Sequence, residues 1–108
     1  MNKQAALKQE GKIIVHVDPD IADLIPGFLE NRRKDIKTIA EALTQGDFET
    51  IQILGHSMKG AGGSYGFDAI TDIGKSLEQA AMAKDSGGIK QMVQELSAYL
   101  DRVEVVYK

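Results

Sequence analysis

The sequence predicts an all-α protein, an antiparallel four-helix bundle with a short additional helix at its N-terminal end. Three observations support this fold class. Apolar residues recur at helical spacing through four long segments within residues 26–103. The connections between these segments are short and contain Gly, Asp or Ser. The only prolines are Pro19 and Pro26, so nothing breaks the later helices.

The first part of the chain precedes the predicted bundle. We expect residues 1–16 to form an N-terminal arm and residues 17–108 to form the bundle domain. Within the arm, residues 13–17 (IIVHV) have a strand-like composition, but no second strand is evident to pair with them. We therefore interpret this stretch as an extended segment that packs on the bundle.

The first two helices are marked by capping residues and prolines. Asp18 and Pro19 are typical of a helix start, with an N-cap followed by Pro at the first helical position. Pro26 disfavours helical geometry at the residue before it, so a second helix should begin at about Pro26 and run to about residue 45. Gly46 then ends the second helix.

The later helices follow the same signals. Asp47 should cap the third helix and Gly66 should end or bend it. Asp68 should cap the fourth helix, and residues 86–88 (Ser-Gly-Gly) are expected to form a turn before the fifth. Met82 and Met92 are expected to be ordinary core residues. The final residues 105–108 are expected to fray.

Composition excludes several classes of function. The net charge of −3 and the scarcity of aromatic residues (6%, no Trp) argue against a nucleic-acid partner. The absence of Cys excludes disulfides and thiolate metal sites. No apolar run is long enough for a membrane span, so we expect a cytoplasmic protein without membrane insertion.

His56 occupies an unusual position in the third helix. At about 100° per residue, five apolar or aromatic residues cluster on one side, which should face the core. These are Ile51, Leu54, Met58, Ala61 and Tyr65. His56 falls roughly 170° from the centre of this cluster and should point to solvent. The residues expected beside it on the outer face are Gln52, Ile53, Lys59, Gly60 and Gly63.

Two of these neighbours are glycines, which an exposed helix face normally avoids. Each Gly costs about 0.5–1 kcal/mol relative to Ala in a helix. Gly60 and Gly63 leave a shallow surface through which another protein can approach the imidazole. Ile53 adds apolar contact area and Gln52 a polar contact, so we predict that Gln52, Ile53, Gly60 and Gly63 bind a partner.

The residue types indicate phosphoryl transfer. An exposed imidazole is largely neutral at neutral pH, and one ring nitrogen can attack a phosphoryl group. Lys59 lies at i+3, where its ammonium can stabilise the added negative charge. No Walker-type loop, kinase nucleotide motif or Mg²⁺ carboxylate cluster is evident, and His56 has no second metal ligand at i+3 or i+4. We therefore expect a phosphate carrier without its own ATP-dependent kinase activity, intrinsic cofactor or metal.

The run from His56 to Gly66, HSMKGAGGSYG, resembles the signature of the histidine phosphotransfer (HPt) family, H-x-(aliphatic)-K-G followed six residues later by Gly. His56, Lys59, Gly60 and Gly66 match this signature in type and spacing. Met58 stands where Leu or Ile is usual. The resemblance extends from about residue 17 to residue 103, with the same order of one short and four longer helices.

This resemblance implies a role in a two-component phosphorelay. His56 would be the phosphoacceptor, Lys59 the stabilising cation, and Gly60 would make room for the partner's active-site loop. The implied partners are response-regulator receiver domains, which supply the aspartate and the Mg²⁺, together with a possible sensor histidine kinase. In relatives, positions near Glu78 and Gln79 lie close to the histidine. Gln79 is then a candidate hydrogen-bond partner, whereas Glu78 would repel a phosphate.

Two other functions remain open from the residues alone. A helical adaptor would bind receiver domains without carrying phosphate, although the presence of both His56 and Lys59 argues against it. The dimerisation domain of a histidine kinase normally has an acidic residue directly after its histidine, whereas Ser57 stands here. The four-helix pattern is complete within one chain, so we expect a monomer, either free-standing or part of a hybrid kinase.

Overall fold

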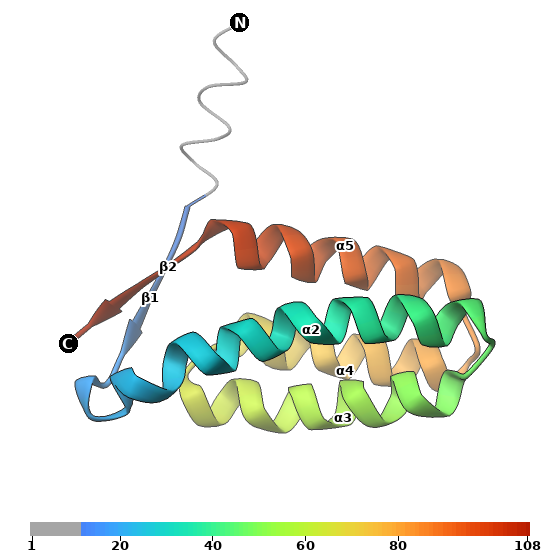
Figure 1. Cartoon of the computed structure of the whole chain (residues 1–108), viewed down its shortest axis with the longest axis horizontal. Helices are drawn as coiled ribbons and strands as arrows, with labels where there is room; N and C mark the ends of the chain where they lie inside the picture. Colours follow the sequence, from blue (N-terminus) through green and yellow to red (C-terminus); the bar gives the residue numbers. More distant parts are fainter. Residues whose placement is uncertain (1–11) are drawn as a thin grey trace, which may run out of the picture.

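The computed structural model describes residues 12–108. Figure 1 shows the long helices packed side by side in an up-and-down arrangement, with both strands at one end of the bundle. The helices are α2 (Ile25–Thr44), α3 (Phe48–Tyr65), α4 (Asp68–Met82) and α5 (Ser86–Arg102). Strand β1 (Ile13–Val17) and the 3₁₀ helix η1 (Pro19–Leu24) precede them, and strand β2 (Val103–Tyr107) follows. The predicted four-helix bundle with a short N-terminal helix is confirmed.

Several predicted helix ends are present in the structure. The Asp18 side chain accepts a hydrogen bond from the Asp20 amide at the start of η1. The Asp47 carboxylate accepts one from the Thr50 amide at 3.1 Å and so caps α3. Gly66 ends α3 with φ +89°, a left-handed conformation that favours glycine.

The starts of α4 and α5 differ from the prediction. Phe67, fully buried, is the N-cap residue of α4, and Asp68 lies in the first turn without capping it. Residues 86–88 form the first turn of α5, because the Asp85 carboxylate accepts a hydrogen bond from the Gly88 amide at 3.0 Å. The capping carboxylate satisfies the free backbone amides that would otherwise favour a turn there.

The prediction that residues 13–17 lack a strand partner is wrong. Strand β1 pairs in parallel with β2, in a register that places Ile13 beside Val103 and Val17 beside Tyr107. Four antiparallel helices return the chain to the end where it started, so the whole bundle serves as the crossover that a parallel pair requires. Residues 105–108 are therefore held by β1 rather than frayed. Residues 13–16 of the expected arm belong to this sheet, and residues 1–11 lie outside the described residues.

The core runs along the axis of the bundle and takes at least one fully buried aliphatic residue from each helix. These residues include Ile39 of α2, Ile51 and Met58 of α3, Leu77 of α4, and Ile89 and Leu96 of α5. Arg33 of α2 also donates a hydrogen bond to the backbone carbonyl of Leu100, which ties the middle of α2 to the end of α5. This core fixes the rotation of α3 and therefore decides which of its residues face outward.

Candidate functional site

The imidazole of His56 projects from the outer face of α3. Its side chain is 69% exposed, while the Lys59 side chain, one turn further along, is 38% exposed. Ile51 and Met58 are buried on the opposite side of the same helix. The prediction from helical spacing that His56 faces solvent is therefore confirmed.

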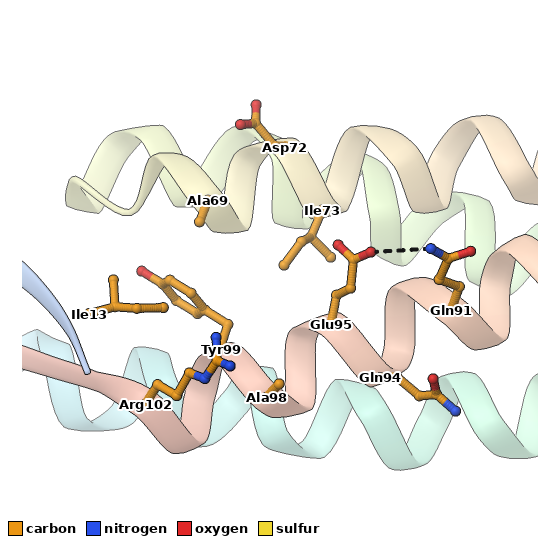
Figure 2. A pocket seen from close by; sticks show the side chains of 10 residues that line it. All are labelled: Ile13, Ala69, Asp72, Ile73, Gln91, Gln94, Glu95, Ala98, Tyr99 and Arg102. Atoms are coloured by element: carbon orange, nitrogen blue, oxygen red, sulfur yellow. Dashed lines mark hydrogen bonds between the residues drawn. The ribbon is translucent and has the colours of Figure 1, made fainter. Parts of the chain in front are cut away.

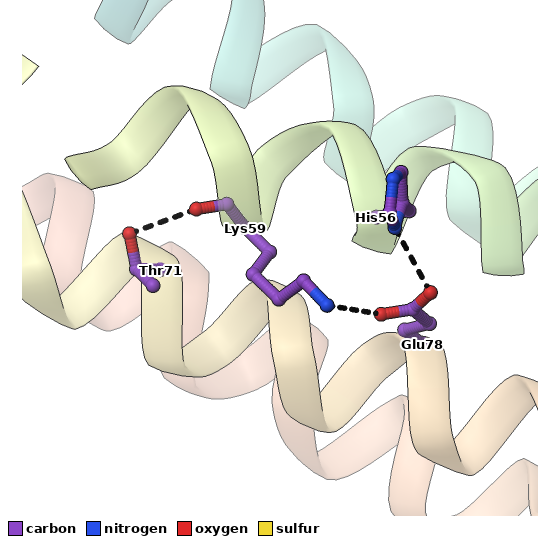
Figure 3. A network of polar contacts seen from close by, with 4 residues as sticks. All are labelled: His56, Lys59, Thr71 and Glu78. Atoms are coloured by element: carbon purple, nitrogen blue, oxygen red, sulfur yellow. Dashed lines mark hydrogen bonds and ion pairs between the residues drawn. The ribbon is translucent and has the colours of Figure 1, made fainter. Parts of the chain in front are cut away.

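Glu78 of α4 lies between the two α3 residues and contacts both. One carboxylate oxygen is 3.1 Å from Nδ1 of His56, and the other is 3.1 Å from Nζ of Lys59. Figure 3 shows His56 and Lys59 reaching down from α3 towards the single carboxylate on α4. The Glu78 side chain is only 18% exposed, so the carboxylate is held at the seam between the two helices.

Glycines allow α3 and α4 to come close enough for these contacts. A Cβ at Gly55 would lie 2.7 Å from the Glu78 amide nitrogen, and one at Gly74 would lie 2.5 Å from the Lys59 amide nitrogen. A Cβ at Gly62 would meet the Thr71 amide nitrogen at 2.6 Å. Any larger residue at these positions would force the backbones apart. The seam thus positions Glu78 beside its two partners.

Electrostatics fix the ionisation of Glu78 and the tautomer of His56. The hydrogen bond from the Lys59 ammonium lowers the pKa of Glu78 below its ordinary value of 4.5, and His56 contributes in the same direction, while burial opposes both. Glu78 is therefore ionised at neutral pH and can only accept hydrogen bonds. In the contact at 3.1 Å, Nδ1 must then be the donor, and the neutral ring keeps its lone pair on Nε2.

Gly60 and Gly63 have no packing reason to be glycine. A Cβ at Gly60 would meet nothing within 4 Å, and one at Gly63 would make only an ordinary contact of 3.6 Å with the Thr71 hydroxyl. Both residues are exposed on the outer face of α3. Their lack of a side chain leaves open space beside His56, which is what the approach of another protein requires.

Apolar residues flank the His56–Glu78 pair on both helices. Ile53, one turn before His56, is 60% exposed, and Gln52 beside it is half-buried. Met82 lies one turn after Glu78 on the antiparallel helix, towards the same end of the seam, and is 63% exposed. Sequence reasoning treated Met82 as a core residue, which is wrong, because position 82 is the last of α4 and extends past the core.

The sequence prediction placed Gln79, rather than Glu78, as the candidate partner of the imidazole. In the structure Gln79 is exposed, and it is Glu78 that contacts His56. Gly55 and Gly74 were the signal that could have fixed the register, because two core-side glycines on successive helices mark a point of close crossing.

A separate hollow lies away from these residues. Figure 2 shows it between α4 and α5 beside the start of β1, with Tyr99 and Arg102 at one end and the Gln91–Glu95 hydrogen bond at the other. None of its lining residues belongs to the His56 site. Within residues 12–108, no cluster of His, Asp or Glu has the arrangement of a metal site, and no helix has the length and apolar character needed to cross a membrane.

Comparison with known proteins gives one match. The family model described as Hpt domain matches residues 23–105, which include η1 from Asp23 onward, all four long helices and the first residues of β2. No curated protein and no solved structure matches the chain.

The close helix crossing can be tested at Gly74. We expect Gly74→Ala to destabilise the fold by about 1–3 kcal/mol, because the added methyl group would press on the backbone of α3. Denaturant unfolding followed by circular dichroism measures this loss. Gly60→Ala is the matched control, since its methyl group meets open space; equal stability of the two variants would contradict the close contact.

The ionisation of Glu78 predicts a dependence of stability on pH. Because the folded-state pKa is lowered, the contribution of Glu78 is fully present above its ordinary value of 4.5 and is lost as the pH falls through the lowered value. Glu78→Gln should therefore lose less stability than the unsubstituted chain between pH 5 and pH 3, roughly the interval over which such a carboxylate titrates. Unfolding curves across this range provide the measurement, with the exposed Glu41→Gln as control. Parallel pH profiles for the Glu78→Gln variant and the unsubstituted chain would contradict the assignment.

Proposed function

Because the chain belongs to the Hpt domain family, whose members take part in histidine phosphotransfer in phosphorelays, we propose that it carries a phosphoryl group on Nε2 of His56. The observation that supports this assignment most directly is the exposed imidazole whose Nδ1 contacts the Glu78 carboxylate. That contact directs the lone pair of the ring to the nitrogen that faces away from α4. The Hpt family comprises phosphocarriers rather than kinases, which agrees with the lack of a nucleotide motif in this sequence.

In the proposed reaction, the Nε2 lone pair attacks the phosphorus atom of an aspartyl phosphate on a receiver domain. The N–P bond forms as the P–O bond to the aspartate breaks, and the electron pair of that bond returns to the partner's carboxylate. The receiver supplies the Mg²⁺ that neutralises the phosphoryl oxygens during transfer. Lys59, one turn from His56, provides an ammonium to the phosphoryl group once it is on the ring.

Docking uses the outer face of α3 and the end of α4. Ile53 on α3 and Met82 on α4 offer apolar area towards one end of the reacting pair, and Gln52 offers a polar contact. Gly60 and Gly63 let the partner's backbone approach without a side chain in the way. The partner that fits this surface is a receiver domain whose active-site aspartate lies at the centre of an apolar rim.

The carrier function is tested by phosphoryl transfer from a panel of phosphorylated receiver domains in the presence of Mg²⁺. We expect the unsubstituted chain and His16→Gln to acquire label that is labile to acid and stable to alkali, whereas His56→Gln acquires none. His16→Gln is the matched control because it removes the other exposed histidine. Equal labelling of His56→Gln would show that another residue accepts the phosphoryl group. Binding to a receiver domain without label on any variant would favour an adaptor that carries no phosphate.

The role of the glycines predicts opposite effects on stability and on transfer. We expect Gly60→Ala to raise the free energy of unfolding by about 0.5–1 kcal/mol, because alanine favours the helix and its methyl group meets no neighbour. The same change should slow transfer from the receiver at subsaturating concentration, because the methyl group occupies space that the partner needs. Gly27→Ala in α2, which also meets open space, should leave transfer unchanged. Unchanged transfer by Gly60→Ala would contradict the docking role.

A further inference from the structure

The Glu78 carboxylate contacts both His56 and Lys59, so an anion that binds at His56 would share the Lys59 ammonium with it. In the resting site the charges of Lys59 and Glu78 cancel, and Nδ1 of His56 donates a hydrogen bond to the carboxylate. Lys59 is the one lysine or arginine within ion-pair distance of Glu78 among residues 12–108. The resting arrangement is therefore complete, with each charged group satisfied by a partner.

A phosphoryl group on Nε2 disturbs this balance. It brings a charge of about −1.5 to −2 at neutral pH, which exceeds the single positive charge that a protonated ring can offer. The new anion lies across the imidazole ring from the Glu78 carboxylate, which contacts the other ring nitrogen. A single ammonium must then serve two anions, and its hydrogen bond to Glu78 competes with its contact to the phosphoryl oxygens.

From this geometry we propose that Glu78 biases His56 towards giving its phosphoryl group away, by raising the free energy of the phosphorylated site relative to the resting one. This inference rests on the carrier function proposed above. In the donating direction, an aspartate oxygen of the receiver attacks phosphorus, the N–P bond breaks and its electron pair returns to Nε2. The proton stays on Nδ1, where Glu78 accepts it in a hydrogen bond, so the departing ring returns directly to its resting tautomer.

The proposal is tested by the position of the transfer equilibrium. Each variant is incubated with a phosphorylated receiver domain and Mg²⁺ until the ratio of phosphohistidine to phosphoaspartate is constant. We expect Glu78→Gln to raise this ratio by about three- to tenfold, the effect of removing one unit charge about 6 Å from another in a partly exposed site. Glu41→Gln in α2 removes the same charge far from the site and should leave the ratio unchanged.

A second comparison separates the shared cation from direct repulsion. The same equilibrium is measured for Lys59→Met with and without Glu78→Gln, which completes a double-mutant cycle. We expect the Glu78→Gln effect to shrink when Lys59 is absent, because part of it arises from releasing the ammonium to the phosphoryl group. An undiminished effect would overturn the shared-cation part of the proposal.

The outcomes distinguish this inference from the function on which it rests. If the unsubstituted chain and Glu78→Gln both carry acid-labile label but reach the same ratio, or if the ratio falls, the bias is overturned while the carrier function stands. If the unsubstituted chain carries no label on His56, the carrier function fails and the inference fails with it. Matching far-UV circular dichroism spectra at neutral pH, recorded below the unfolding transition, establish that the compared variants share the same fold.

Discussion

The geometry of the site depends on how closely the backbones of α3 and α4 approach each other. Gly55 and Gly74 lie where a single methyl group would collide with the facing backbone. The short approach brings the Glu78 carboxylate to 3.1 Å from both a ring nitrogen of His56 and the ammonium of Lys59. A wider seam would leave the same three side chains on the surface without fixing the tautomer of the ring, because long side chains lose entropy when they are held only by exposed ion pairs.

The glycines of α3 fall into two groups with opposite physical meanings. Gly55 and Gly62 face α4, where packing requires them, and their lost helix propensity is offset by close contact between helices. Gly60 and Gly63 face solvent, where no neighbouring group requires a glycine. Their cost in helix stability is therefore not offset by any packing contact within the folded chain. A residue that weakens the fold without an internal gain points to a constraint from outside the chain, which under the proposed function is the approach of a partner to the imidazole.

Most of the bundle could be predicted from the sequence because helical periodicity and capping are local. Asp47 and Gly66 bound α3 through contacts within a few residues, and the same periodicity placed His56 outside. The pairing of β1 with β2 joins residues about ninety positions apart, so no local pattern could reveal it. Glu78 was missed as the partner of His56 for the same reason, since the register between two helices depends on packing rather than on spacing along either one. Met82 was misplaced because periodicity does not show where a helix projects beyond the core.

The arrangement also suits a site whose reacting side chain is exposed on the outer face of a helix. A carrier must react with another protein's active site, so its own residues need only present one nucleophilic atom in the correct protonation state and tolerate the charge that arrives. In the proposed reaction, Glu78 meets the first requirement by accepting a hydrogen bond from Nδ1, and Lys59 meets the second. The two needs conflict, because the group that orients the ring is itself an anion. In the bias proposed above, a neutral acceptor in place of Glu78 would hold phosphate more firmly, whereas the carboxylate would raise the free energy of the phosphorylated state and favour passing the group on.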